Sequence, residues 1–183
     1  MSAFKAAKCH VRYAEEKDFL DLEQMYREHE GHSLPKGYFS DYQTTLRNNS
    51  VTYLVATVDG RVVGGGGITN YIPGNHAALT FGIVAPSECR KGYGTSILLS
   101  RLLYVDPRPN GCQINLQATE WSAHFFRRIG FSWYGKDQDD EGNRFLFGTQ
   151  TVNPGDEQVF QRILKEGGVT LGFQPDRPTL SLE

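Results

Sequence analysis

The segment Cys89–Thr95 carries the residue types that bind an oxyanion, because it combines two glycines with Arg90 and Lys91. It lies between an expected strand that ends at Val84 and an apolar helix expected over Gly94–Tyr104. The first amides of a helix have no partner within the helix, and the helix dipole makes that end positive. Glycines let the backbone curl closely around a bound anion. The segment therefore predicts a site that would fit a pyrophosphate.

The residues alone leave a second interpretation open, in which the turn only lets the helix pack closely against the strand. Other nucleotide motifs fit less well, because Ile97 stands where the dinucleotide fingerprint needs its third glycine. Cys89 also has two interpretations. A thiol beside a helix N-terminus and two cations would have a lowered pKa and be reactive, but we prefer a small structural residue in a turn.

Periodicity and turn residues predict the elements that position this segment. Apolar residues at helical spacing predict further helices over Glu15–His29, Tyr38–Asn48 and Ser122–Ile129, and another after Asp156. Runs of β-branched and aromatic residues predict strands over Cys9–Tyr13, Val51–Val58, Arg61–Ile72, Ala77–Val84, Gln113–Ala118, Phe131–Gly135 and Arg144–Thr151. Adjacent hairpins with a helical crossover imply an α/β (α+β) fold with a mixed sheet. The four glycines at 64–67 suggest a bulge or a close backbone approach.

Length, charge and cysteine usage bound the class of protein. The 183 residues suit one domain, and a net charge of −2 argues against a nucleic-acid partner. Cys9, Cys89 and Cys112 form no C-x-x-C pair, so no metal or redox motif is indicated. An odd number of separated cysteines fits a reducing, cytoplasmic compartment. No signal peptide or membrane-spanning run is evident, so we expect no membrane partner.

Two motifs resemble those of a known family. The run Val84–Thr95 resembles motif A of the GCN5-related N-acetyltransferases (GNAT), which is Val-x-Pro, a spacer, then [Gln/Arg]-x-x-Gly-x-[Gly/Ala]. Downstream, Phe125–Phe131 resembles the family's next signature, commonly Phe-Tyr-x-x-x-Gly-Phe. The order of expected elements also agrees with the family across roughly residues 9–151, which is most of the chain.

The resemblance implies a GNAT-like mixed, mostly antiparallel central sheet flanked by helices, with acetyl-CoA, a form of coenzyme A, as co-substrate. The strands Ala77–Val84 and Gln113–Ala118 would splay apart to hold the thioester. The implied cofactor-binding residues are Gly82, Ile83, Val84, Cys89, Arg90, Lys91, Gly92, Tyr93, Gly94 and Thr95. Residues 1–152 would form the catalytic domain, and 153–183 a C-terminal helix and arm packed on it or extending from it.

The implied activity is transfer of an acetyl (acyl) group to a primary amine by direct attack in a ternary complex. The acidic hairpin Asp139-Asp140-Glu141 favours a small cationic molecule as acceptor, although a hairpin turn needs polar residues anyway. The alternatives are a non-catalytic acyl-CoA-binding module and a protein or peptide N-acetyltransferase. We expect a monomer or a homodimer.

Three residues depart from the family pattern. Cys89 occupies the usual Gln/Arg position, where backbone amides do most of the binding. Phe126 occupies the position at which many members carry a tyrosine that protonates the departing thiolate. Ala78 stands where the histone-modifying branch has its glutamate base, so histone specificity is not implied.

Few side chains remain as catalytic candidates. Glu120 follows the strand Gln113–Ala118 near the expected gap, but a glutamate at a helix start has a structural explanation in the helix dipole. Tyr134 and Tyr71 lie on strands that could border the acceptor pocket, or they pack there as aromatics. We interpret His124 as a structural histidine with satisfied hydrogen bonds. His29 and His32 shape the acceptor site or belong to a solvated loop.

Overall fold

The computed structural model describes residues 5–71 and 75–174, with only the backbone described at Asn70 and Tyr71. Its helices are α1 (Phe19–His29), α2 (Phe39–Leu46), α3 (Tyr93–Tyr104), α4 (Glu120–Ile129) and α5 (Asp156–Glu166). Short 3-10 turns cover Glu16–Asp18 (η1) and Pro86–Glu88 (η2). The strands are β1 (His10–Tyr13), β2 (Thr52–Val58), β3 (Arg61–Tyr71), β4 (His76–Val84), β5 (Cys112–Thr119), β6 (Ser132–Gln138), β7 (Arg144–Val152) and β8 (Thr170–Leu171).

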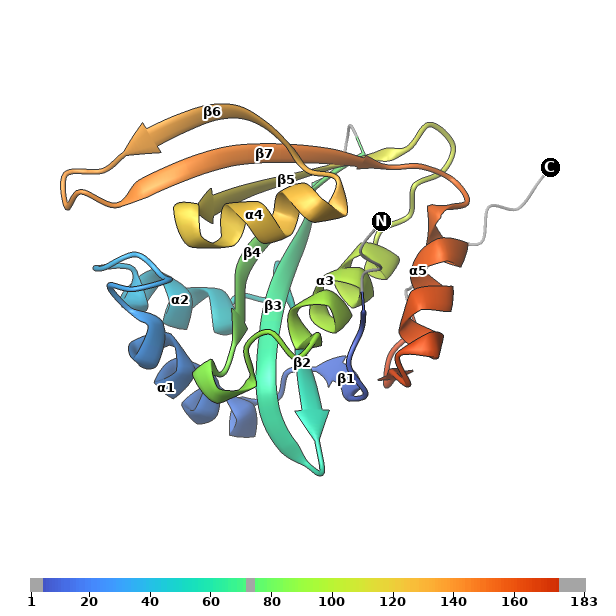
Figure 1. The fold of residues 1–183 in the computed structure, drawn as a ribbon, viewed down its shortest axis with the longest axis horizontal. Helices are drawn as coiled ribbons and strands as arrows, with labels where there is room; N and C mark the ends of the chain where they lie inside the picture. The colour runs from blue at the N-terminus through green and yellow to red at the C-terminus, as the bar shows by residue number, and fades with distance from the viewer. Residues whose placement is uncertain (1–4, 72–74, 175–183) are drawn as a thin grey trace.

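These strands form one sheet in the order β6-β7-β5-β4-β3-β2-β1-β8 (Figure 1). Only the pairs β4–β5 and β1–β8 are parallel, and every other pair is antiparallel. Strands β4 and β5 are parallel because the chain crosses over through α3 and returns to the same end of the sheet before β5 begins. The predicted mixed, mostly antiparallel sheet is therefore confirmed.

Helices cover both faces of this sheet. Successive strand residues point to opposite faces, and both sets of side chains are buried. Tyr53 and Val55 of β2 pack with α1 and α2, whereas Leu54 and Ala56 belong to the cluster that includes Ile97 of α3. The largest buried cluster joins α3, β4 and β5 with residues of α4 and α5. Helix α3 thus lies against the middle of the sheet, as Figure 1 shows.

The glycine run of β3 contains both features that the sequence suggested. A Cβ atom on Gly66 would lie 2.7 Å from Cζ of Arg101, and one on Gly64 would lie 2.9 Å from a methyl group of Ile97. On the opposite face, a Cβ atom on Gly65 would lie 2.7 Å from the ring of Tyr53. The pairing with β4 also shifts register between Gly65 and Gly67. Larger residues could not approach α3 this closely.

Strand β4 separates from β5 halfway along its length. The two strands pair only from His76 to Leu79, opposite Gln113–Leu116. Beyond this point β4 contains Phe81, whose φ of 40° lies in the left-handed region, at the position where the register with β3 shifts. Such a β-bulge bends a strand and ends regular pairing. The splayed strand pair predicted for this fold is therefore confirmed.

Several boundaries shift by a few residues, such as the start of α4 at Glu120 rather than Ser122, and two further differences have a clear physical reason. Helix α1 begins at Phe19 rather than Glu15, because the Asp18 carboxylate accepts a 2.8 Å hydrogen bond from the Glu15 amide and closes a 3-10 turn first. Within the C-terminal segment, expected as an arm or tail, Thr170–Leu171 forms β8, and the Thr170 amide donates to the Cys9 carbonyl oxygen at 3.0 Å. The rest of this prediction, over residues 175–183, lies outside the described residues. Phe160 of α5 belongs to the main core, so this helix packs on the preceding residues.

Candidate active site

The splayed strands border a cleft of about 1530 Å³. Its walls come from the separated parts of β4 and β5, the turn before α3, helix α4 and the segment between α1 and α2. Nine of the ten residues expected to bind the cofactor line this cleft. The exception is Tyr93, which packs against the buried cluster of Val11, Leu54 and Ile97. The cleft joins the predicted anion turn to the strand gap.

The turn before α3 has the backbone shape of an anion site. Gly92 is the N-cap of α3 with φ of 105°, and Arg90 also has a positive φ, of 62°. A Cβ atom on Gly92 would lie 2.6 Å from the carbonyl oxygen of Lys5, so this residue must be glycine. Gly94 has more room, because its Cβ atom would meet only Phe125, at 3.6 Å, and more distant atoms.

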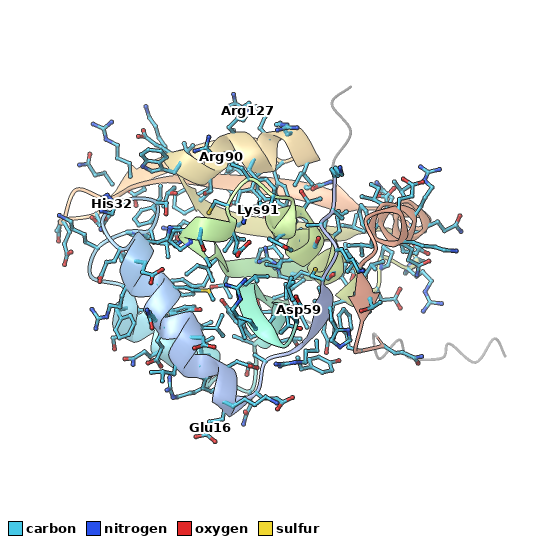
Figure 2. All side chains as sticks on the ribbon, turned by 60° about the horizontal axis from the view of Figure 1, so that its bottom comes forward. Glu16, His32, Asp59, Arg90, Lys91 and Arg127 are labelled. Carbon is cyan, nitrogen blue, oxygen red and sulfur yellow. The ribbon has the colours of Figure 1, made fainter. Side chains whose placement is uncertain are left out.

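The two cations of this turn differ in their partners. Lys91 donates a 2.9 Å hydrogen bond to Glu88, which Arg61 also contacts at 3.2 Å. The bond from Lys91 lowers the pKa of Glu88 and keeps it ionised. Arg90, by contrast, has no ion pair within the described residues. Figure 2 labels the side chains of Arg90 and Lys91. Arg90 is therefore the cation available to an anionic ligand.

Cys89 is exposed, and its thiol lies against two carbonyl oxygens of this turn. Its Sγ atom lies 3.5 Å from the carbonyl oxygen of Ala85 and 3.7 Å from that of Val84. Desolvation raises the pKa of the thiol and outweighs the lowering effect of Arg90. The thiol therefore remains protonated at neutral pH and is a weak nucleophile.

His29 connects the end of α1 to the edge of β4. Its Nε2 atom lies 2.7 Å from the carbonyl oxygen of Val84, and its Nδ1 atom lies 2.5 Å from Oγ of Ser33. Because a carbonyl oxygen only accepts, Nε2 carries the hydrogen, and Nδ1 of a neutral ring accepts from the serine. His29 is half-buried and lines the cleft, so it is not part of a solvated loop.

Helix α4 contributes an aromatic wall without an acid at the family's tyrosine position. Phe126 lines the cleft and packs edge-on against Phe125 and Phe131, with ring centroids 5.2 and 5.5 Å apart. His124 also lines the cleft and is exposed. Helix α4 turns this side chain away from its apolar face, and the interpretation of His124 as a structural histidine stays a prediction.

The structure places the catalytic candidates Tyr134 and Glu120 differently. Tyr134 lines the cleft with 66% of its surface exposed, and its ring stacks on Phe147 at 6.3 Å. Glu120 is not among the residues that line the cleft, and its carboxylate lies 3.7 Å from Arg144 at the surface. Its role as a base stays a prediction that this geometry does not support. The Tyr71 side chain lies outside the described residues.

Two aromatic residues of the cleft had no signal in the sequence. Trp121, the second residue of α4, is 75% exposed and lines the cleft. Tyr38 precedes α2, lines the cleft and packs edge-on against Phe145 with centroids 5.8 Å apart. Its hydroxyl donates a 3.0 Å hydrogen bond to Asp139, which raises the pKa of the tyrosine. Only the folded chain brings these distant residues together.

The acidic hairpin lies outside the cleft. The Asp139 carboxylate accepts hydrogen bonds from Tyr38, from the amide of Glu141 and from both nitrogens of Asn143. Among the described residues, no Asp or Glu lines the cleft, whereas its basic residues are Lys5, Arg90, Lys91, Arg101 and Arg128. No cluster of metal-ligand side chains occurs in the described ranges. The cleft thus suits anionic groups.

A splayed sheet edge beside a glycine turn and helix N-terminus defines the fold and site of an acyltransferase of the GNAT type. The family model described as Acetyltransferase (GNAT) family matches residues 16–131 of this chain. The chain belongs to the GNAT acetyltransferase family. A comparison with curated protein sequences gives no match.

Solved structures share the fold at low sequence identity. An aminoglycoside 6'-N-acetyltransferase in complex with coenzyme A is 14% identical, with a TM-score of 0.62, and the match covers 79% of this chain and 97% of that one. A ribosomal-protein-alanine N-acetyltransferase from Escherichia coli is 14% identical over 78% and 93% of the chains, with a TM-score of 0.59. A spermidine N-acetyltransferase chimera from Vibrio cholerae and hSSAT is 14% identical over 85% and 99%, with a TM-score of 0.59.

Proposed function

We propose that this chain transfers an acetyl (acyl) group from acetyl-CoA to the primary amine of a small molecule, by direct attack in a ternary complex. One observation carries the proposal: the gap between β4 and β5 opens directly beside the glycine turn and the N-terminus of α3. A pyrophosphate and a thioester joined by an extended arm need these two features next to each other.

The described residues provide a place for each part of coenzyme A. The amides of Cys89–Thr95 and the side chain of Arg90 would hold the pyrophosphate. The backbone of Gly82 and Ile83 would pair with the pantetheine arm as with an added strand. The carbonyl oxygen of Val84 already accepts from His29, so the arm would use the other backbone groups of this stretch.

The transfer itself needs little from acidic or basic side chains. The amine nitrogen forms a bond to the thioester carbon, the carbon–sulfur bond breaks, and the proton lost by the amine ends on the thiol. A lysine-like amine has a pKa of about 10.4 and must first lose a proton, whereas the leaving thiol, with a pKa of about 8.5, needs no strong acid. A backbone amide near Ile83, beyond the Phe81 bulge, would donate to the developing oxyanion. Positioning supplies much of the remaining rate.

The acceptor stays a proposal. The similar structures act on an aminoglycoside, a spermidine and a ribosomal-protein alanine, which gives small polycations some support. The hairpin residues Asp140 and Glu141 are exposed and could attract such an amine from outside the cleft. A monomer or homodimer, a cytoplasmic location and the absence of a nucleic-acid partner also stay predictions. No helix in the described parts of the chain is long and apolar enough to cross a membrane.

Release of free thiol from acetyl-CoA tests the proposal. The panel contains an aminoglycoside, spermidine, a peptide with an N-terminal alanine and a free amino acid, each with heat-inactivated protein as control. We expect release that depends on at least one small amine. Thiol release only with the peptide would favour a protein N-acetyltransferase. Stabilisation by coenzyme A, but not by ATP or NAD, without any release would identify a non-catalytic binding module.

A further inference from the structure

A buried cation that has no anionic partner among the described residues lies beneath the cleft. Arg101 belongs to α3 and is 2% exposed. Its Nη1 atom donates to the carbonyl oxygen of Gly67 at 3.2 Å, and its Nε atom is buried with no hydrogen-bond partner in the described residues. No carboxylate lies within 4.0 Å of the guanidinium in the described parts of the chain. Most of its donors are therefore unused.

Burial of an unpaired charged group in a core is energetically unfavourable. An unpaired buried charge loses its hydration, and an apolar residue of similar size would be more favourable at this position. Burial lowers the pKa of Arg101 to about 10, which still leaves the guanidinium protonated at neutral pH. The sheet also makes room for it, because Gly66 leaves free the volume that the guanidinium occupies. These costs are explained if a ligand supplies the missing anion.

The guanidinium lies at the part of the cleft where the strands have separated. Arg101 lines the cleft, and its Nη2 atom lies 3.0 Å from the position that a Cβ atom on Gly82 would take. Gly82 is beyond Leu79, the last residue of β4 that pairs with β5. Arg90 lies at the turn and would meet the pyrophosphate, so Arg101 faces a different part of the ligand.

We propose that Arg101 binds a carboxylate at the far end of the acyl group, so that the preferred donor is the thioester of a dicarboxylic acid, of malonyl or succinyl type. A guanidinium matches a carboxylate with two parallel hydrogen bonds. Because no acidic residue of the described ranges lines the cleft, these donors are left to the ligand. This inference rests on the proposed function, since it places the acyl chain in the strand gap. It adds the class of acyl group.

Binding of two matched pairs of thioesters tests this proposal. Malonyl-CoA is compared with isovaleryl-CoA, and succinyl-CoA with isocaproyl-CoA, because the members of each pair have the same heavy-atom shape and differ in the carboxylate. Isothermal titration of the wild type should give about tenfold tighter binding, or more, for the carboxylate member of at least one pair. Equal affinity within both pairs overturns the proposal.

Variants connect this preference to Arg101. In Arg101→Met we expect the ratio within that pair to fall to about one, and in Arg101→Lys to an intermediate value. Arg90→Met should instead weaken all four ligands alike. If Arg101→Met does not fold, the affinities are measured with Gly66→Ala instead. The Cβ atom of this variant would displace the guanidinium and should reduce the same ratio. A preference that survives in the folded variants contradicts the proposal. Failure of free coenzyme A to bind the wild type would instead overturn the proposed function.

Discussion

The hydroxyl of Tyr53 donates a 2.8 Å hydrogen bond to the carbonyl oxygen of Phe81, the residue at which β4 bulges. The oxygen of Tyr53 also lies 3.1 Å from the hydroxyl of Tyr42, which donates to it because the Tyr53 hydrogen is already used. A non-glycine residue with positive φ costs on the order of 1–3 kcal/mol and needs support from its surroundings. This buried chain of hydrogen bonds supplies that support. It therefore helps to keep the strand gap open.

Replacement of Tyr53 by Phe should weaken both the fold and the site. The Phe81 carbonyl loses its donor, so we expect a loss of about 1–2 kcal/mol in the free energy of unfolding, measured by urea denaturation. The affinity for coenzyme A should fall severalfold because the bulge relaxes. Tyr42→Phe is the matched control, since it removes one buried hydroxyl but leaves the Tyr53–Phe81 bond intact. Equal loss of coenzyme A affinity in both variants would show that the Tyr53–Phe81 hydrogen bond has no specific effect on the binding site.

Replacement of Phe126 by Tyr tests whether the site lacks an acid. The leaving thiol needs little help, so we expect kcat to change by less than about tenfold. Phe126 already lines the cleft, so the hydroxyl of the tyrosine would be added inside the cleft. Tyr134→Phe serves as the parallel measurement on the other aromatic candidate. A gain of order 10² in kcat for Phe126→Tyr, the usual contribution of acid–base catalysis, would contradict our mechanism.

Neutralisation of Asp140 and Glu141 tests for attraction of a cationic amine. Asp139 stays unchanged because its carboxylate holds the hairpin together. If the two exposed carboxylates steer the acceptor, kcat/KM for the best amine falls severalfold at low salt and recovers as salt rises. Exchange of Asp156 and Glu157 for amides, at the start of α5, is the charge-matched control. If kcat/KM is unchanged at every salt concentration, the hairpin does not attract the acceptor.

Asp139 should make the stability of the hairpin depend on pH. Hydrogen bonds from Asn143, with smaller contributions from Tyr38 and the Glu141 amide, lower the pKa of this carboxyl in the folded chain. An unfolded aspartate has a pKa of about 3.9, so the stabilisation is complete above that pH and is lost as the pH falls below it. Asp139→Asn should therefore flatten the acid limb of the stability profile measured by denaturation between about pH 2.5 and pH 6. A profile that keeps its acid slope in the variant would show that other carboxyls cause it.

Local sequence patterns were enough to predict most of the fold. The β-branched and aromatic residues of Val51–Val58 and the Asp59-Gly60 turn specify a hairpin through neighbours in the chain. The start of α1 was misplaced because the Asp18 side chain first closes a 3-10 turn. Strand β8 was missed because a two-residue strand has no periodicity, and it exists only through its pairing with β1.

The site was predictable only where one segment carries it. The turn at Cys89–Thr95 is continuous in the chain, so its glycines and cations could be recognised together. His29 and Val84 are 55 residues apart, and nothing near either residue indicates their contact. Arg101 is four residues after Ile97, so helical spacing alone puts it on the buried face. Its relation to the glycine run became visible only in the folded chain.

The affinity for coenzyme A in a graded series at Gly94 tests the central claim most directly. Gly92 is unsuitable for this purpose, because its positive φ and its contact with Lys5 would perturb the fold in any variant. A side chain at Gly94 instead points toward Phe125 at the cleft wall and requires no change in the backbone. We expect Gly94→Ala to bind coenzyme A nearly as well as the wild type, and Gly94→Leu and Gly94→Trp to lose affinity progressively, by about 10²-fold or more for Trp, with unchanged unfolding transitions. Wild-type affinity in a folded Gly94→Trp variant would contradict the account, because coenzyme A could not then occupy this turn.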